Sequence, residues 1–448
     1  MKTASGSLRR LSLLLLAALA AAPTARAAIE FSYRFSSGAL IPDSGQLVDT
    51  RLVTHPGLTS ISAVSLDLDL ASAPGDSMWL GDLYATLTHG TALENERVAV
   101  LLNRPGRDPL NPFGSALHEL FVTLDDAASD SVYAITGDTG TYRPDGRLDV
   151  DPYAAPVAYS PGTQTLSALT GPVLASGTWS LLLADTSAFD AARLNSWTLR
   201  LTGTVMPGAP ITIPSIATAR FSENFDADIT LAPGAGVEFS GAMTGLLTTA
   251  AGSTIRLGPF ATLGPAPFTL SPGATLSGTG VVSGPAVVSG DLTPGNSPGI
   301  LTFTAGLTLT GTSTTSLEIA GPDRGVGYDG INLTTAGALT YGGTLSLHFG
   351  VPVAPGTYNF FNRTAPVTQS GDFAQLTIGG TAGPPAPVVF TAGQGWSVVV
   401  DDHYLRFSNE SGDLIITPIP EPAAQATLLA LAALALALGA SRPRRAGK

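Results

Sequence analysis

Three side chains that carry oxygen atoms, Asp185, Asp190 and Asn195, lie close together in the chain. Carboxylate and amide oxygens are the ligands that Ca²⁺ prefers, so this segment is a candidate calcium site. Three oxygens fall short of the roughly six to eight ligands that Ca²⁺ takes in proteins. In the alternative interpretation, Asp185 and Asn195 only cap turns, as Asp and Asn often do in loops.

The other motifs that could carry chemistry point away from catalysis. Residues 295–299 spell GNSPG, which matches the GxSxG pattern of α/β-hydrolases. That chemistry needs a backbone N–H on the residue after the serine, but Pro298 has none, and β-forming residues follow instead of a helix. The five histidines show no HExxH or short HxH spacing. The densest titratable cluster, Asp401, Asp402 and His403, is typical of a solvated β-turn. The sequence therefore predicts no catalytic residue and no enzyme activity.

The composition limits the class of protein. The 448 residues include 51 Gly, 34 Pro and no Cys, and 12% are charged, which is typical of a turn-rich β protein without disulfides. The net charge of −12 becomes more negative when the basic N-terminal segment is removed, so we expect no nucleic acid partner. Lysine occurs only at Lys2 and Lys448, which excludes Schiff-base chemistry between them.

The N-terminal segment has the features of a secretory signal peptide. Basic residues precede an apolar run at 11–22, and Ala25 and Ala27 form an AxA cleavage site. We expect signal peptidase to remove residues 1–27 during export.

The C-terminal segment, residues 417–448, combines three ordered elements. A Pro-Glu-Pro motif precedes an apolar run at 423–440 that is long enough to cross a bilayer as a transmembrane helix, and arginines follow it. The motif residues are Pro420, Glu421, Pro422, Arg442, Arg444 and Arg445. This order resembles the PEP-CTERM sorting signal of Gram-negative bacteria, which an exosortase-type enzyme recognises. The resemblance implies export, at least transient insertion in the inner membrane, and a place at the cell surface or in an extracellular polysaccharide matrix.

Residues 28–205 are predicted to form an antiparallel β-sandwich of the jelly-roll type. Short runs with period-two alternation recur at 62–70, 83–87, 98–102 and 119–124 between turn signals. Trp179, Leu181 and Leu183 share one face of a later strand, and the next strand begins after a polar loop that ends at Asn195. The expected core contains Leu66, Leu68, Leu83, Val100, Phe121, Trp179, Leu181 and Trp197.

Ordered motifs in this region resemble the P domain, also called the Homo B domain. They are IPDSG at 41–45, GDLYATLTHG at 81–90, LLNRPG at 101–106, LFVTLDDAA at 120–128, YRPDG at 142–146 and the segment 177–203. The resemblance implies a jelly roll that normally follows a subtilisin-like protease domain, and some P domains bind Ca²⁺ through loop carboxylates. The family favours Gly two residues after the second Asp, whereas Ala192 stands here. A domain that begins at the signal cleavage site leaves no room for a catalytic domain.

Residues 206–416 are predicted to form a parallel β-solenoid-like domain. Short apolar strands alternate with Gly, Ser and Thr turns, without a fixed period. Segments 292–311 and 328–349 resemble the passenger-associated repeats of autotransporter-like surface proteins, and segments 370–378 and 395–408 resemble the cap that often ends such arrays. The expected fold class is therefore all-β, a jelly-roll sandwich followed by a solenoid, between a signal peptide and a transmembrane helix.

These features predict a non-enzymatic, exported surface or extracellular-matrix protein. One alternative is an adhesin module that binds carbohydrate or protein through loops such as 103–115. Another is an accessory of a separate serine endopeptidase, which has only the P-domain resemblance to support it.

Overall fold

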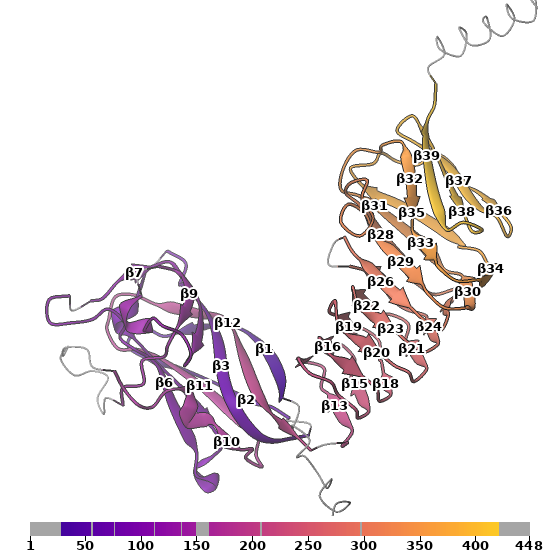
Figure 1. The fold of residues 1–448 in the computed structure, drawn as a ribbon. Coiled ribbons are helices and arrows are strands. Elements are labelled where there is room, and N and C mark those ends of the chain that lie inside the picture. The colour runs from indigo at the N-terminus through magenta and orange to yellow at the C-terminus, as the bar shows by residue number, and fades with distance from the viewer. Residues whose placement is uncertain are drawn as a thin grey trace, which may run out of the picture.

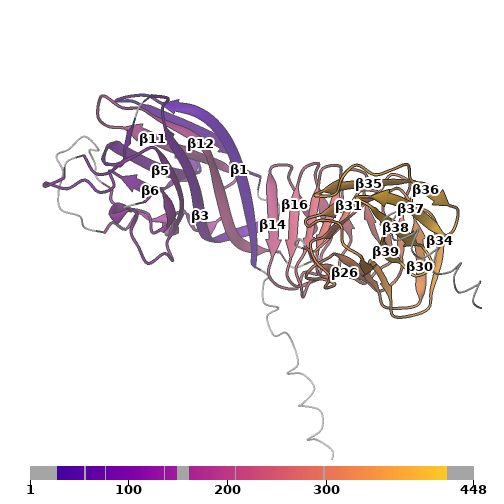
Figure 2. The same cartoon turned by 90° about the horizontal axis from the view of Figure 1, so that it is seen from above.

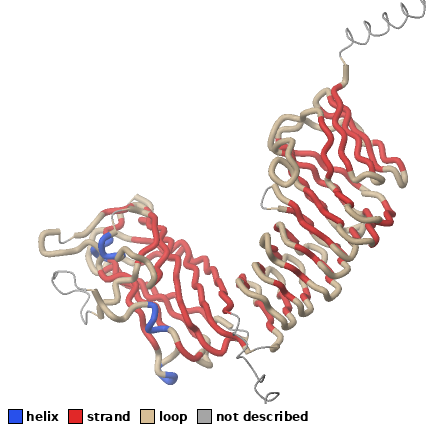
Figure 3. Tube along the Cα trace, in the orientation of Figure 1, coloured by secondary structure: helices blue, strands red, loops and turns tan. Residues whose placement is uncertain are grey.

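The computed structural model in Figure 1 describes residues 28–54, 57–75, 77–111, 113–135, 137–148, 161–206, 208–295 and 298–420. The described chain is all-β, as predicted (Figure 3), and its helical elements are the short 3₁₀ turns η1 (Leu80–Asp82), η2 (Ala92–Glu94), η3 (Val132–Ala134) and η4 (Leu166–Leu169). Among the described residues, no helix has the length and apolar character needed to cross a membrane. The predicted signal peptide and transmembrane helix lie outside the described residues.

Two sheets make up the head, which we define as residues 28–205 (Figures 1 and 2). The first sheet has the order β1 (Ala28–Ile41), β12 (Ala192–Val205), β3 (Leu58–Ser72), β8 (Glu119–Asp125), β9 (Thr139–Tyr142), with β10 (Gly171–Pro172) beside β3. The second has the order β2 (Gln46–Leu52), β11 (Thr178–Asp185), β5 (Leu83–His89), β6 (Arg97–Asn103), and a short pair joins β4 (Met78–Trp79) to β7 (Ala116–Leu117). Neighbouring strands are antiparallel except β8 and β9, which are parallel.

The alternating residues of these strands build the core between the two sheets. Trp179 of β11 and Trp197 of β12 are both buried, and the indole N–H of Trp197 donates to the carboxylate of Asp49 in β2 at 2.9 Å. Seven of the eight predicted core residues are buried: Leu66, Leu68, Leu83, Val100, Trp179, Leu181 and Trp197. The prediction for Phe121 was wrong, because its side chain is 53% exposed. Leu120, Val122 and Leu124 take the inner face of β8, so the alternation turns Phe121 outward.

Three parallel sheets wind together into a solenoid-like stack over residues 211–380 (Figure 1). One side consists of β14 (Ala217–Phe221), β16 (Gly236–Phe239), β19 (Thr254–Leu257), β22 (Thr275–Gly278), β25 (Asp291–Pro294), β28 (Thr314–Ile319), β31 (Thr344–Phe349) and β35 (Gln375–Gly380). The second consists of β13 (Ile211–Ile213), β15 (Ile229–Leu231), β18 (Leu247–Thr248), β21 (Phe268–Leu270), β24 (Ala286–Val288), β27 (Leu307–Leu309), β30 (Gly337–Tyr341) and β34 (Val367–Gly371). The third consists of β17 (Ala242–Met243), β20 (Thr262–Leu263), β23 (Val281–Val282), β26 (Ile300–Phe303), β29 (Gly330–Leu333) and β33 (Phe361–Arg363).

The rungs of this stack lengthen along the chain. Ile211 pairs with Ile229 in the first rungs, whereas Leu307 pairs with Leu339 later. The longer rungs contain insertions such as 320–329, where the carbonyl of Asp323 accepts three backbone N–H groups. The changing length explains why the sequence shows no fixed period.

Hydroxyl groups at the corners of the rungs satisfy backbone carbonyls of neighbouring rungs. Ser271 donates to the carbonyl of Thr249 at 2.8 Å, and Ser283 donates to that of Leu263 at 3.2 Å. Thr312 does the same for Ser289 at 3.0 Å. Corner backbone groups are therefore paired where the strands end.

An antiparallel cap sheet closes the C-terminal end of the stack (Figure 1). Its order is β32 (Gly356–Asn359), β39 (Asp413–Pro418), β38 (His403–Ser408), β37 (Gly395–Val400), β36 (Val389–Thr391). Phe407 of β38 contacts Tyr341, Phe361 and Phe373, which belong to the last rungs. The predicted cap segment 395–408 lies in this sheet, but most of segment 370–378 belongs to β34 and β35 of the last rung.

The head and the solenoid share one hydrogen-bonded sheet. β1 pairs with β12 of the head along one edge and with β14 of the first rung along the other. Phe31 lies opposite Ala219 and Ile29 lies opposite Phe221, and all four side chains are buried. Phe221 also packs on Phe225 and Phe239, at 4.7 and 5.2 Å between ring centroids.

We expect Phe221→Ala to lower the free energy of unfolding by about 3–5 kcal/mol, because it removes a buried ring from the junction between head and solenoid. Urea unfolding followed by tryptophan fluorescence measures this. Phe121→Ala is the matched control, and since Phe121 is exposed we expect a change within about 0.5 kcal/mol. Equal destabilisation by both changes would contradict the assigned faces.

Candidate functional site

Four carboxylates gather at one end of the head. Asp185 ends β11, and Asp190 lies in the loop that carries the chain across to β12 of the opposite sheet. Asp82 comes from η1, and Asp43 lies in the turn between β1 and β2. These loops meet because the end of β1, the start of β5 and the end of β11 lie at the same edge of the head.

Backbone amides hold part of this carboxylate cluster. The N–H of Ser187 donates to Asp185 Oδ1 at 3.1 Å, and the N–H of Trp79 donates to Asp190 Oδ2 at 2.9 Å. The N–H of Phe189 donates to Asp43 Oδ2 at 3.2 Å. The bond from Ser187 closes a turn within its own loop, whereas the bonds from Trp79 and Phe189 each join two segments that are far apart in the chain. These bonds therefore hold the loops together.

Two buried oxygens in the cluster have no hydrogen-bond donor. Asp82 Oδ1 and Asp185 Oδ2 are both inaccessible and unpartnered, and the two residues are 4% and 1% exposed. A buried acceptor without a donor costs about 1–3 kcal/mol, and more if the group is charged. Protonation of a carboxyl group lowers this cost, because it removes the buried negative charge.

The pKa values of the buried carboxyl groups reflect this cost. The pKa of Asp185 is raised to about 7, mainly by burial and to a smaller extent by the charges of Asp190, Asp82 and Asp43, while the hydrogen bond from the Ser187 N–H lowers it. Burial also raises the pKa of Asp82, while a hydrogen bond with Ser187 and the charge of Arg107 lower it. Burial is the main physical cause in both residues, since removal from water disfavours the charged form of a carboxyl group.

The structure brings together two of the three residues predicted for a calcium site. Asp185 and Asp190 interact, but Asn195 lies in β12, where its side-chain amide donates to Asp69 Oδ1 at 3.0 Å. Sequence reasoning missed Asp43 and Asp82 as members of the cluster. Both stand in the quoted motifs IPDSG and GDLYATLTHG, which are far apart in the chain, so no spacing rule connects them to Asp185.

The cluster has the type of donor atom that a cation prefers, but it has too few ligands. Carboxylate oxygens suit Ca²⁺, and Asp82 Oδ1 and Asp185 Oδ2 are the atoms that it would bind. Within the described ranges, however, no three His, Asp or Glu side chains are arranged to hold a metal ion. The position that departs from the P-domain pattern, Ala192, begins β12, and the left-handed conformation falls on Phe189 at φ 88°.

The other sequence candidates are dispersed. Several of them lie outside the described residues, namely Ala25, Ala27, Ser297 and the arginines of the sorting motif. Pro420 is the last described residue. Asp401 and Asp402 form the two-residue turn that was predicted between β37 and β38, both with positive φ. His89 is buried and stacked on Trp179, with 4.1 Å between ring centroids.

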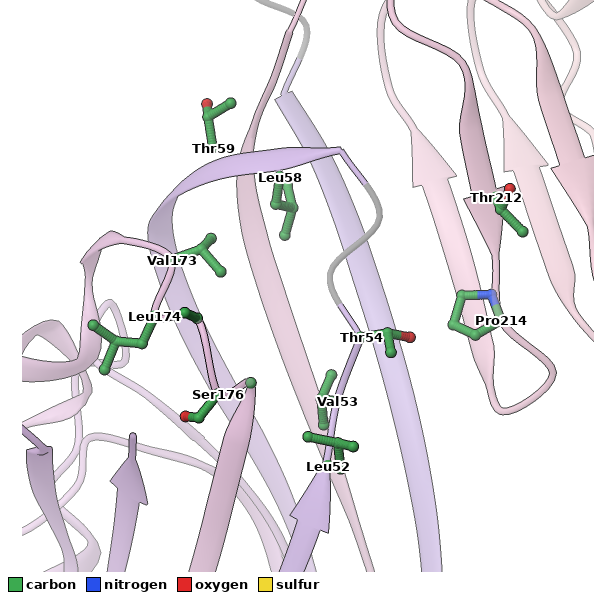
Figure 4. A pocket seen from close by; sticks show the side chains of 12 residues that line it. Leu52, Val53, Thr54, Leu58, Thr59, Val173, Leu174, Ser176, Thr212 and Pro214 are labelled. Carbon is green, nitrogen blue, oxygen red and sulfur yellow. The ribbon is translucent and has the colours of Figure 1, made fainter. Parts of the chain in front are cut away.

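A groove lies beside the junction of head and solenoid (Figure 4). It encloses about 800 Å³ between the end of β2, the start of β3, the segment 173–177 and the first solenoid strand. Its labelled side chains are mostly apolar, including Leu52, Val53, Leu58 and Leu174, with Thr212 and Pro214 on the solenoid side. None of the described residues that line the groove has a charged side chain.

Comparison with known proteins identifies no relative. No protein-family model matches the chain, and no curated protein matches it. The resemblances to the PEP-CTERM signal, the P domain and the autotransporter-like repeats therefore remain predictions that rest on the quoted motifs.

The raised pKa of Asp185 predicts a pH-dependent stability. An unfolded Asp loses its proton near pH 3.9, whereas folded Asp185 holds it up to about pH 7. The folded protein binds more protons over this window, so its contribution to stability is present at low pH and is lost as the pH rises through about 7. We expect the thermal midpoint in EDTA to fall between pH 4.5 and 7.5, and Asp185→Asn to reduce this fall.

Asp329→Asn is the comparison variant for this measurement. Burial raises the pKa of Asp329 to about 6, and its carboxylate accepts the N–H groups of Gly299 and Glu318, away from the cluster. Asp329→Asn should therefore reduce the fall only up to about pH 6, whereas Asp185→Asn should reduce it up to about pH 7. An equal pH slope in the wild type and Asp185→Asn would contradict the assignment of the raised pKa.

Proposed function

We propose that this protein is a non-enzymatic, exported surface or extracellular-matrix protein. In this proposal the solenoid is a rigid spacer that holds the head away from the site where the C-terminal segment is anchored. The sorting motif around Pro420 would direct the chain through an exosortase-type system after signal peptidase has removed residues 1–27.

One observation carries this proposal. The head joins the first rung through β1 and β14, whereas the described chain leaves the molecule from β39 at the opposite end of the stack (Figure 1). The β1–β14 pairing holds the head on the first rung more firmly than a flexible linker would, because bending at the junction must break the hydrogen bonds between these two strands. A rod with its anchor at one end and a folded head at the other suits a surface-presented protein.

Within this proposal, the head is a P/Homo B-like jelly roll. Support comes from the two sheets, the consecutive strands β11 and β12 that lie in opposite sheets, and the quoted motifs.

A second candidate function is an adhesin module, and exposed apolar side chains on the head favour it. Leu110 is 96% exposed and Phe113 is 61% exposed in the loop that the sequence analysis singled out. Phe189, beside the carboxylate cluster, is 95% exposed. Exposed aromatic residues on neighbouring loops are common at sites that bind proteins or sugars. Glycan-array binding that Phe113→Ala abolishes would favour this candidate.

Deletion of the chain from Pro420 onward tests the proposed function. We expect the truncated protein to appear in the medium or the periplasm, because the apolar run and the sorting motif are lost. Cell fractionation with immunoblotting measures its location. Replacement of Arg442, Arg444 and Arg445 by Lys is the matched control, since it keeps the positive charge and should keep the location. Unchanged surface retention of the truncated protein would refute the proposal.

A further inference from the structure

One edge of the second sheet of the head is open. β2 pairs with β11 along one side, and in the described part of the chain no hydrogen bond reaches the backbone of its other side. The opposite edge of the same sheet is covered, because the N–H of Val100 in β6 donates to the carbonyl of Gln164 at 2.7 Å and its carbonyl accepts the N–H of Gly146 at 3.0 Å. The fold therefore shields one edge of this sheet with loop backbone and leaves β2 unshielded.

Alternate residues of β2 direct their backbone groups at the open edge. The N–H of Val53 donates to the carbonyl of Gly177, and the N–H of Asp185 donates to the carbonyl of Gly45, both at 2.9 Å. Odd-numbered residues of this segment therefore bond to β11, because the direction of the backbone groups alternates along an antiparallel strand. The even-numbered residues of β2 point their N–H and C=O groups at the open edge, and their side chains are exposed: Gln46, Val48, Thr50 and Leu52.

The solenoid does not cover this edge. β14 pairs with β1 only as far as Tyr33, whereas Arg51 of β2 lies over the ring of Phe35 at 5.3 Å. The part of β2 that precedes Arg51 therefore extends past the first rung. On the other side of Arg51, the groove in Figure 4 separates Leu52 from Pro214 of the solenoid. An additional strand thus has space along the whole length of β2.

The charges of β2 do not prevent it from pairing with a copy of itself. Exposed edge strands usually avoid such pairing through Pro, Lys or an isolated inward charge. β2 contains neither Pro nor Lys, and its two charged residues, Asp49 and Arg51, have opposite signs. They form an ion pair within the strand, with 2.7 Å between Arg51 Nε and Asp49 Oδ1. The strand is therefore neutral, although the whole chain has a net charge of −12.

Self-complementarity selects one register for such a pair. When two antiparallel copies of β2 are centred on Thr50, Asp49 of each copy lies opposite Arg51 of the other. Val48 then lies opposite Leu52, and these apolar side chains are 51% and 69% exposed in the single chain. A pair centred on Asp49 or on Arg51 would instead place like charges opposite each other, which is unfavourable.

We propose that two copies of this chain associate through β2 of the head, in the antiparallel register centred on Thr50. The contact joins their two four-stranded sheets into one continuous sheet through about six backbone hydrogen bonds. β2 extends over only about 24 Å, so the buried area is smaller than the roughly 800 Å² per partner of a stable complex, and the dimer is weak. This inference goes beyond the proposed function and does not depend on where the cell places the protein.

Sedimentation equilibrium of the full chain, purified from its native cells, tests this proposal. The average mass should rise toward that of a dimer between about 1 µM and 1 mM, the range in which weak contacts dissociate. The measurement needs about 0.15 M salt, because the Debye length of about 8 Å then screens the repulsion between two acidic chains.

The variant Thr50→Pro should weaken dimerisation by about tenfold or more, since it removes the N–H group at the centre of the contact from both copies. The single chain should tolerate it, because Pro is accepted in an edge strand where the N–H points away from the sheet. Thr50→Ala is the matched control, since it changes the side chain but keeps the N–H, and it should dimerise like the wild type. Equal thermal midpoints would show that both variants fold.

A cysteine cross-link tests the register. The chain has no Cys, so Thr50→Cys introduces a single thiol. Directly opposite residues in a hydrogen-bonded antiparallel pair have Cα atoms about 5.5 Å apart, which a disulfide can span. With oxidised glutathione as the oxidant, this variant should form a covalent dimer on a gel without reductant. Gln46→Cys is the matched control and should not, because the two thiols would lie about 27 Å apart.

Three outcomes would overturn the proposal. A chain that stays monomeric up to about 1 mM would leave the edge of β2 to a different partner. A dimer that Thr50→Pro leaves intact would place the contact elsewhere on the molecule. Equal cross-linking of Thr50→Cys and Gln46→Cys would show random collision of thiols instead of the predicted register.

Discussion

The pairing of β1 with β14 is the contact on which the rest of the structure depends. The first strand of a parallel stack has unpaired N–H and C=O groups along one edge, and such an edge invites aggregation. β1 covers this edge on one side of the solenoid and belongs to the head at the same time. Glu30 and Arg220 pair across it at 3.3 Å, but both are partly exposed, so the buried pairs Phe31 with Ala219 and Ile29 with Phe221 matter more. One apolar core therefore runs from head to solenoid.

Stacking in the solenoid separates two kinds of polar side chain. Inward positions carry apolar residues, and corner hydroxyls bond to backbone carbonyls of adjacent rungs, so the fold uses them. Outward positions in the middle of a strand also stabilise the stack, because Thr and Val favour strands and pairs of hydroxyl side chains on neighbouring strands interact, as Thr340 and Ser370 do at 3.2 Å.

The carboxylate cluster of the head destabilises the fold, because it buries carboxylate oxygens that have no hydrogen-bond donor. Asp82 and Asp185 are buried without a donor for one oxygen each, and Phe189 beside them has the unusual φ of 88°. Unsatisfied polar atoms and backbone strain often coincide at sites that bind something. The raised pKa of Asp185, about 7, shows that burial in this cluster favours the protonated form of the carboxyl group.

The sequence alone determined the features that depend on local pattern. Period-two alternation located the strands at 62–70, 83–87, 98–102 and 119–124, because neighbouring side chains on a strand must face opposite sides. The all-β class and the change from antiparallel sheets to short repeated strands followed from the same pattern and from the Gly-rich turns.

Tertiary structure alone decided which distant residues meet. Asp43 and Asp82 join Asp185 only because three loops end at one end of the head, while Asn195 turns to Asp69. The rung register stayed hidden because insertions change the rung length. In each case the deciding interaction joins residues far apart in the chain, and no local spacing encodes such a contact.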